Sequence, residues 1–494
     1  MNEQTTEKQN DNDTKTVTSF HELGLSEKRC QALKKKGFSA PTPIQERIID
    51  VFNATDDDII GISQTGSGKT ASFGLPILDQ MTEQKKQPQV IILAPTRELA
   101  IQVSAELSSY SSFDKIRILT VYGGSPITNQ IKSLKQGVEV VVGTPGRVLD
   151  LMRRSALKLN EVRYVVLDEA DEMLNMGFIE DIETVLEASP DDKRLMLFSA
   201  TMPPRIKKLS KKYMEKQNIV DVRKLVETKP DIEHRYYIAN REEKYDCLRR
   251  LVDFEENFYG IVFCMTKADV DDLTIQLQNG GYKAEAIHGD VVQIKREKIL
   301  NQFKTKKIKI LVATDVAARG IDVTDLNFVV NHSIPKKTET YVHRIGRTAR
   351  AGKSGIAISF VGHRARSSIQ QLEKSLNYEL KLCQPPSNKE LFEKHVHTLK
   401  RSVESSIDKE KGSHLDTISS DFMGSFENKH LIRALLNKLL PKPSEDTVSV
   451  NNNVSNKPEY RKKRNRSYSS QSNRNDRRSH SRTNGKGRRK QSTR

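Results

Sequence analysis

The chain contains 494 residues and carries a formal net charge of +18 at pH 7, with a mean hydropathy of −0.61. This hydropathy and the lack of any apolar stretch of about 18 residues exclude a membrane span, and the polar, acidic start predicts no secretory signal. The four cysteines are isolated, with no CxxC pair, which argues against a zinc site and a disulfide framework. We therefore expect two or three ordinary domains in a reducing, cytoplasmic compartment.

The first domain is predicted at residues 19–224, after a polar segment at 1–18 that we expect to be disordered. Short apolar runs alternate here with longer amphipathic segments, a pattern typical of buried parallel strands in βα units. Several runs end in polar, glycine-rich or acidic residues, which is where open α/β sheets bind ligands. The predicted strands are residues 59–62, 90–94, 138–142, 164–167 and 195–198.

A phosphate-binding loop is predicted at residues 63–70, directly after the first apolar run. Its sequence, Ser-Gln-Thr-Gly-Ser-Gly-Lys-Thr, combines glycines that turn tightly with backbone N–H groups and a helix N-terminus that favour anions. Lys69 would reach the β- and γ-phosphates, and Thr70 would bind Mg²⁺. A purely structural glycine-rich turn is the alternative for such a loop taken alone.

Acidic residues follow the predicted strand at 164–167. Asp168 lies at the carboxyl end of this strand, where it can hold Mg²⁺ through water, and Glu169 is the candidate to orient and deprotonate the attacking water. Acids at helix starts are also common caps, but a phosphate-binding loop in the same domain strengthens the functional interpretation. Together the two segments predict a nucleotide and Mg²⁺ site.

The same alternation of strands and helices restarts in a second predicted α/β domain at residues 225–380. Its predicted strands are residues 260–263, 284–287, 308–313, 328–330 and 356–361. A basic segment near its end, His-Arg-Ile-Gly-Arg-Thr-Ala-Arg at 343–350, contains candidates for phosphate contacts. Read alone, this octapeptide could be only a basic helix face.

Two further segments complete the chain. Residues 381–442 contain apolar side chains spaced by three and four, which predicts helices with one apolar face each. Those faces either pack on each other or form a subunit interface, so a homodimer is one expectation. Residues 443–494 should be a disordered, RNA-binding tail, because the part from Lys457 to Arg494 has fifteen basic and two acidic residues and almost no aliphatic ones. A merely solubilising tail is the alternative.

Nine blocks occur in the order and spacing of the DEAD-box RNA helicases, which the chain resembles over about residues 20–380. The blocks include Asp-Glu-Ala-Asp at 168–171 and Ser-Ala-Thr at 199–201. The others are residues 37–45, 63–70, 95–100, 123–124, 144–147, 313–322 and 343–350. The resemblance implies two tandem RecA-like parallel-sheet domains and an RNA-dependent ATPase. Residues 381–442 more weakly resemble the helical region of bacterial cold-shock members, which implies a homodimer.

By position, the resemblance implies which residues bind ATP. Phe38 is similar to the aromatic that stacks on adenine, Gln45 to the amide that pairs with its edge, and Phe20 to an isolated upstream aromatic. Asp322 is similar to the ribose ligand, and Arg347 and Arg350 to arginine fingers that reach the γ-phosphate. The loop contributes the remaining candidates, Thr65, Gly66, Ser67, Gly68, Lys69 and Thr70. The family usually has Ala at the position of Ser63 and Gly at that of Ala349.

The resemblance also implies an RNA groove shared by both domains. Its candidates are Arg97, Gly124, Thr144 and Arg147 in the first domain and Gln293, Arg296 and Thr314 in the second. Arginines, hydroxyls and backbone N–H groups suit phosphates and 2′-hydroxyls, so binding should be largely independent of sequence. Ser199, Thr201 and His343 are similar to the residues that couple the ATP and RNA sites.

The mechanism expected from a divided site is closure of a cleft by ATP and RNA together, each tightening the binding of the other. At about 1.4 kcal/mol per stacked step, closure would disrupt only a handful of base pairs. An RNA-binding scaffold or annealing protein with a vestigial ATPase is one alternative, and a DNA helicase is another. Ribosome assembly, messenger decay and cold adaptation all remain open as pathways, with their protein partners.

Overall fold

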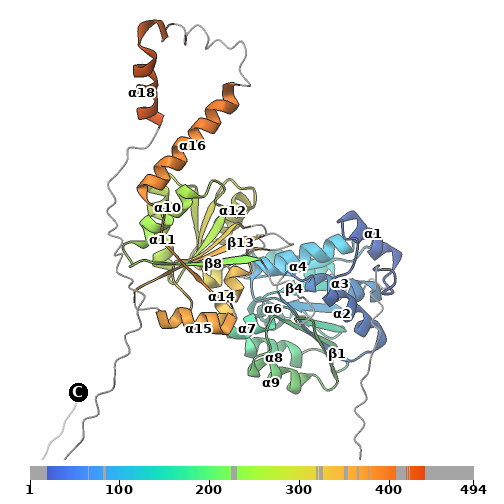
Figure 1. The fold of residues 1–494 in the computed structure, drawn as a ribbon. Coiled ribbons are helices and arrows are strands. Elements are labelled where there is room, and N and C mark those ends of the chain that lie inside the picture. The colour runs from blue at the N-terminus through green and yellow to red at the C-terminus, as the bar shows by residue number, and fades with distance from the viewer. Residues whose placement is uncertain are drawn as a thin grey trace, which may run out of the picture. The chain divides into compact units, whose positions relative to one another are not determined.

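The computed structural model describes residues 19–64, 66–81, 85–223, 231–318, 321, 326–349, 354–363, 366–376, 378–407, 419, 421 and 423–439. These residues contain two seven-stranded sheets, each with parallel strands throughout (Figure 1). The expected fold of two tandem RecA-like parallel-sheet domains is therefore confirmed. The expected disordered segments at 1–18 and 443–494 lie outside the described residues. Within the described part, no helix is both long and apolar enough to span a membrane.

The first sheet has the strand order β3-β4-β2-β5-β6-β1-β7. Its strands are β1 (Asp58–Ile62), β2 (Val90–Leu93), β3 (Ile118–Val121), β4 (Val140–Gly143), β5 (Tyr164–Leu167), β6 (Arg194–Ser199) and β7 (Gln217–Asp221). The four strands β2, β4, β5 and β6 are completely buried. Because these strands are parallel, the carboxyl ends of β1, β2, β5 and β6 lie at one edge of the sheet, where ligands of open α/β sheets bind.

Helices cover both faces of the first sheet, since alternate strand residues belong to two separate hydrophobic cores. Ile59 and Ile92 pack with the helices of one core, whereas Ile60 and Ile91 pack with those of the other. The first core includes α1 (Glu27–Lys35), α2 (Pro43–Ala54), α3 (Lys69–Gln80) and α4 (Arg97–Tyr110). The second includes α5 (Ile127–Gln136), α6 (Pro145–Arg153), α7 (Ala170–Asn175), α8 (Ile179–Glu187) and α9 (Pro204–Tyr213).

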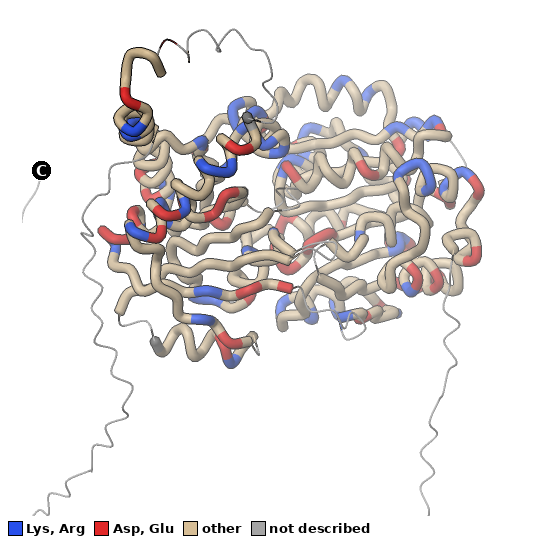
Figure 2. Tube along the Cα trace, turned by 45° about the horizontal axis from the view of Figure 1, so that its top comes forward, with Lys and Arg blue, Asp and Glu red and all other residues tan. Residues whose placement is uncertain are grey.

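The second sheet repeats this architecture with the order β10-β11-β9-β12-β13-β8-β14. Its strands are β8 (Ile232–Ile238), β9 (Gly260–Cys264), β10 (Ala284–Ile287), β11 (Ile310–Thr314), β12 (Phe328–Asn331), β13 (Gly355–Val361) and β14 (Lys381–Cys383). One core includes α10 (Lys244–Phe254) and α11 (Lys267–Asn279). The other includes α12 (Gln293–Lys304), α13 (Asp315–Ala318), α14 (Thr338–Ile345) and α15 (Arg366–Leu376). Figure 2 shows that charged residues are concentrated on the helices and loops of both sheets.

The two amphipathic helices that the apolar spacing predicted are found among the described residues after the second sheet. They are α16 (Asn388–Ile407) and α18 (Asn428–Leu439). The first half of α16 contacts α10, since Lys394 donates to the backbone carbonyl of Phe254 and its ammonium lies 4.5 Å from the centre of that ring. By contrast, α18 has no buried residue, and its apolar side chains Leu435 and Leu439 are 48% and 62% exposed.

Candidate nucleotide and RNA site

The predicted phosphate-binding loop connects β1 to the first turn of α3, at the ligand-binding edge of the first sheet. Gly66 and Gly68 have φ values of +81° and +93°, which side-chain-bearing residues rarely adopt. A Cβ atom on Gly68 would also lie 2.3 Å from Nε2 of Gln45. Glycine at position 68 is therefore required by both its backbone conformation and its surroundings.

Side-chain hydrogen bonds close this loop. The hydroxyls of Ser63 and Ser67 lie 2.8 Å apart, and Ser67 donates to the carbonyl of Gln64 over 2.9 Å. Lys69, the predicted phosphate ligand, is only 7% exposed, and its ammonium donates to the carbonyl of Ser63 over 3.1 Å. Thr70, the predicted Mg²⁺ ligand, lies in the first turn of α3.

The predicted catalytic acids lie directly after β5. The carboxylate of Asp168 is nearly enclosed, at 3% exposed, and accepts a hydrogen bond from the backbone N–H of Glu169 over 3.0 Å. Burial raises the pKa of Asp168 to about 7, although the nearby Lys69 opposes this shift. Glu169 has a φ of +51°, a conformation that costs a non-glycine residue energy and often marks a functional position.

These residues fit a hard divalent cation. Mg²⁺ binds through one or two oxygen ligands of the protein together with water and nucleotide phosphates. Asp168 supplies a buried carboxylate whose charge is incompletely compensated, as its raised pKa indicates, and Thr70 supplies a hydroxyl on the adjacent helix. The chemistry of this donor set matches Mg²⁺, and the assignment of the two residues as its ligands stays a prediction.

The segment before the loop contains the predicted adenine-binding residues. Gln45 is 4% exposed, and its amide joins two elements: the oxygen accepts from the N–H of Thr42 over 2.9 Å, and the nitrogen donates to the carbonyl of Gly68 over 3.2 Å. Phe38 is 45% exposed and so remains accessible to a base. Phe20 is buried in the core that contains α2 and α3, which makes packing its observed role.

A hydrogen-bonded chain links the acidic segment to the Ser-Ala-Thr segment at the end of β6. The side chain of Asp171 accepts from both the N–H and the hydroxyl of Thr201, over 3.0 and 2.7 Å. The hydroxyl of Ser199 donates to the carbonyl of Thr201 over 2.6 Å. The carbonyl of Ser199 in turn accepts from the N–H of Ser63 over 3.2 Å, so this chain reaches the phosphate loop.

His343 is brought to the acidic segment from α14 of the second sheet. Its Nδ1 lies 2.5 Å from a carboxylate oxygen of Glu172. Burial alone would lower the pKa of His343, but the hydrogen bond to Glu172 and the charges of Glu172, Asp171 and Glu169 outweigh it and raise the pKa. Glu172 was not predicted from the sequence, although it is an acid one turn after Asp168.

Some of the predicted RNA-binding residues of the two domains also contact each other. A guanidinium nitrogen of Arg97 donates to Oε1 of Gln293 over 2.9 Å, and Gly124 lies so near Arg97 that a Cβ there would be 2.6 Å from the guanidinium. Nε of Arg296 lies 2.6 Å from Oε1 of Glu98, and its Nη2 donates to the carbonyl of Ala317. Glu98, next to the predicted Arg97, is a partner that sequence reasoning missed.

The remaining predicted RNA contacts occupy neighbouring element ends. Thr144 is the residue before α6, and Arg147 in that helix donates to Oε1 of Gln130 over 3.1 Å and to the carbonyl of Ser125 over 3.3 Å. Thr314 is the last residue of β11. Their proximity to strand ends agrees with a groove at the ligand-binding edge, while their contact with RNA stays a prediction.

Arg347, one of the two predicted arginine fingers, donates to the carbonyl of Ile321 over 3.0 Å and lines a small cavity with His343 and Asp315. The neighbouring Arg344 is structural: it is 4% exposed and binds the carboxylate of Asp315 through two nitrogens, over 2.5 and 2.8 Å. The predicted contacts Thr65, Asp322 and Arg350 lie outside the described residues.

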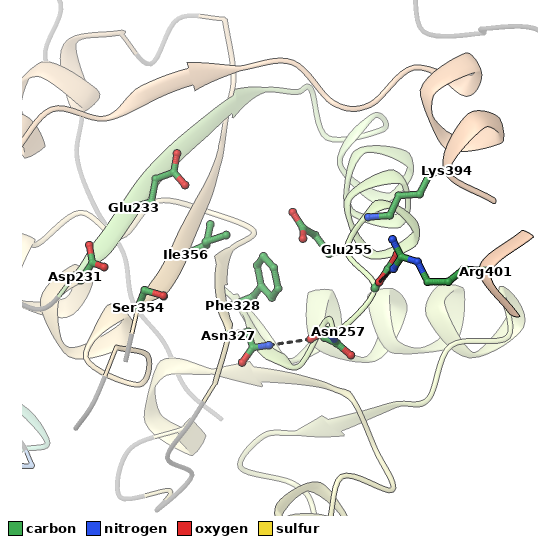
Figure 3. A pocket seen from close by; sticks show the side chains of 12 residues that line it. Asp231, Glu233, Glu255, Asn257, Asn327, Phe328, Ser354, Ile356, Lys394 and Arg401 are labelled. Atoms are coloured by element: carbon green, nitrogen blue, oxygen red, sulfur yellow. Dashed lines mark hydrogen bonds and ion pairs between the residues drawn. The ribbon is translucent and has the colours of Figure 1, made fainter. Parts of the chain in front are cut away.

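A larger pocket of about 780 Å³ lies at the opposite, amino-terminal edge of the second sheet (Figure 3). Asp231, Glu233 and Glu255 line it, together with Lys394 and Arg401 of α16. Its excess of carboxylates disfavours the phosphates of a nucleotide or of RNA. Volume alone therefore does not identify the nucleotide site of this chain.

Comparisons with known proteins agree with this arrangement. A family model described as DEAD/DEAH box helicase matches residues 42–209, and one described as helicase conserved C-terminal domain matches residues 243–352. The chain is 42% identical over 434 residues to the ATP-dependent RNA helicase CshA of Listeria monocytogenes, covering 88% of this chain and 83% of that protein.

Solved structures of RNA-bound proteins are also similar to this chain. A structure of Dbp5 from S. cerevisiae bound to RNA and ADP BeF3 matches with a TM-score of 0.69 and 34% sequence identity. The match covers 75% of this chain and 96% of that one.

Proposed function

The chain belongs to the DEAD-box family of ATP-dependent RNA helicases, and from that premise we propose that ATP and RNA bind across its two sheets and drive local separation of short duplexes or remodelling of RNA–protein complexes. The observation that carries this proposal is the pairing of Arg97 with Gln293 and of Arg296 with Glu98. These contacts join residues of the two sheets beside the strand ends where ligands bind. RNA that engages these arginines would therefore act on both domains at once.

The roles in hydrolysis follow from charge and position. Lys69 and the arginines Arg347 and Arg350 would neutralise charge on the transferred phosphoryl group, while Glu169 orients and deprotonates the attacking water. Asp168 and Thr70 would hold Mg²⁺, which supplies charge stabilisation at the phosphates when it is bound. Phe38 and Gln45 would select adenine, and Ser199, Thr201 and His343 would couple this site to RNA.

Steady-state ATP hydrolysis by the full chain, with and without unstructured RNA, tests the proposal. We expect RNA to stimulate turnover, and Glu169→Gln to abolish turnover while the affinities for ATP and RNA are retained. Glu187→Gln, at an exposed position in α8, is the matched control and should behave as the wild type. RNA binding without any ATP turnover by the wild type would overturn the enzyme and favour the scaffold.

We also propose that the chain forms a homodimer through residues 381–442. The support is the exposed apolar face of α18, where Leu435 and Leu439 are 48% and 62% exposed. An apolar face of this kind is stabilised by burial against a partner. Light scattering should detect a dimer that Leu435→Glu with Leu439→Glu converts to a monomer, whereas Asn437→Glu leaves it intact. A wild type that is monomeric at tens of micromolar would refute this proposal.

We propose a cytoplasmic location, where the family's substrates ATP and RNA occur together, with ribosome assembly, RNA decay and cold adaptation as candidate pathways. Crosslinking of RNA to the protein in cells, followed by sequencing, would distinguish ribosomal from messenger targets.

A further inference from the structure

Glu297 lies one turn after Gln293 on α12, and its carboxylate accepts a hydrogen bond from Nε2 of Gln293 over 2.8 Å. The other end of the same amide reaches the first domain, because Oε1 of Gln293 accepts from a guanidinium nitrogen of Arg97 over 2.9 Å. Gln293 is 6% exposed, so little water reaches this amide. One glutamine side chain thus connects an acid of α12 with an arginine of the other domain.

The two partners fix the direction in which the amide of Gln293 faces. A guanidinium can only donate hydrogen bonds, and an ionised carboxylate can only accept them. The amide therefore turns its oxygen toward Arg97 and its nitrogen toward Glu297. The reverse orientation would place N–H groups against N–H groups at Arg97 and oxygen against oxygen at Glu297.

The contact between the domains depends on this orientation. Without an acceptor at position 297, the oxygen of Gln293 would face Arg97 only while the amide nitrogen of the same side chain loses its partner. A buried N–H group that loses its partner costs more free energy than the hydrogen bond itself contributes. Arg97 also lies against Gly124, where a Cβ would be 2.6 Å from its guanidinium, so the same contact holds Arg97 beside a second predicted RNA-binding residue.

We propose that Glu297 is a positioning residue for the RNA response, because it orients the amide of Gln293 toward Arg97 across the two domains. Side chains one turn apart on a helix often pair with each other. This pair differs because the same amide also contacts the other domain. The inference rests on the function proposed above, in which RNA acts on both domains through Arg97.

A series of substitutions at position 297 in the full chain tests the proposal. Glu297→Gln keeps an oxygen that can accept from Gln293 but removes the charge, whereas Glu297→Leu removes both, and all three residues are good helix formers. In assays of the RNA-stimulated ATPase, Glu297→Gln should have a KM for unstructured RNA close to that of the wild type. Glu297→Leu should raise this KM roughly fivefold or more, the equivalent of about 1 kcal/mol.

Two controls separate positioning from a structural effect. Lys298→Leu removes a charge from an exposed position of the same helix and should respond to RNA as the wild type does. Because Glu297 is itself exposed, the melting temperatures of its variants should match that of the wild type. In a Gln293→Leu background, Glu297→Leu should have no further effect on the KM for RNA, since the amide that it orients is already absent.

Three results would overturn the assignment of Glu297. They are a wild-type KM for RNA in Glu297→Leu, an equal rise of this KM in Glu297→Gln and Glu297→Leu, which would show that only the charge acts, and additive effects of the changes at 293 and 297. A wild type whose ATPase is not stimulated by RNA would instead overturn the proposed function, and this inference with it.

Discussion

The carboxylate of Glu98 lies 2.6 Å from Nε of Arg296, and both side chains are about nine-tenths buried, with relative exposures of 10% and 12%. This pair joins the start of α4 to α12, two helices that flank different sheets. Removal of one member of a buried pair leaves the other charge uncompensated, which costs more than the loss of a surface ion pair.

Glu98→Gln should therefore weaken the response to RNA. Truncation of one partner of a desolvated charge pair costs about 2 kcal/mol or more. For the ion pair of Glu98 with Arg296, this predicts a loss of roughly thirtyfold or more in kcat/KM for RNA in the RNA-stimulated ATPase reaction. Glu106→Gln, on the same helix, is the control, since its carboxylate accepts a hydrogen bond from Gln102 one turn away. An RNA response of Glu98→Gln equal to that of this control would contradict the prediction.

The contact between His343 and Glu172 predicts a pH dependence of coupling. The pKa of His343 is raised in the folded chain by Glu172. The stabilisation that the charged pair gives to the folded chain is therefore fully present below the ordinary histidine pKa of about 6.5. It is lost as the pH rises through the raised value. RNA stimulation of the ATPase should decline over that range, and His343→Gln should remove this part of the pH profile. A wild-type profile identical to that of His343→Gln would exclude the effect.

Substitution of Ala349 by glycine is expected to stabilise the fold. Ala349 has a φ of +54°, in the left-handed region where a Cβ atom costs about 1 kcal/mol. Ala349→Gly should therefore raise the melting temperature of the second domain by a few degrees, as scanning calorimetry would measure. Ala357→Gly, in the buried strand β13, should have the opposite effect because it creates a cavity and loosens a strand. Equal destabilisation by both glycines would show that Ala349 is not strained.

The Asp58→Asn variant is expected to become more stable than the wild type as the pH rises. In the wild type, the carboxylate of Asp58 accepts the N–H of Leu195 over 2.7 Å, and burial raises its pKa to about 6. A raised carboxyl pKa stabilises the fold at low pH, and this stabilisation is lost as the pH rises from about 4 to 6. Asp58→Asn keeps the acceptor without the charge, so denaturant unfolding should show equal stability near pH 4 and a gain on the order of 1 kcal/mol at pH 7, after allowance for solvent screening. A constant difference across this range would contradict the assignment.

Most of the strands that the sequence predicted lie in the interior of each sheet, the edge strand β10 being the exception. All ten predicted apolar runs correspond to strands, whereas β3, β7, β8 and β14 were missed. The missed strands lie at or next to the sheet edges and are only partly buried, so they contain polar residues such as Glu233 and Arg235 of β8. A continuous apolar run indicates a strand that is buried on both faces of the sheet. A strand at or near an edge is less buried, so its sequence can contain polar residues.

The site could be predicted where chemistry alone fixes the residue type. A phosphate loop requires glycine and lysine at set spacings, and the structure places Gly68 and Lys69 accordingly. The partners Glu98 and Glu172 could not be predicted, because an acid that pairs across two domains has no local spacing rule. For the same reason, the burial of Phe20 became clear only when helices distant in sequence were assembled.

The contact between Gly68 and Gln45 has a consequence for engineering. Thr42 donates to the carbonyl of Ser67 over 2.8 Å, and Gln45 donates to that of Gly68 over 3.2 Å. The segment that we propose to bind adenine and the proposed phosphate loop therefore form one packed unit. Transplanting either segment from a protein with a different base preference would place mismatched side chains against the other. A chimera that changes base preference must therefore exchange residues 42–45 and 63–70 together.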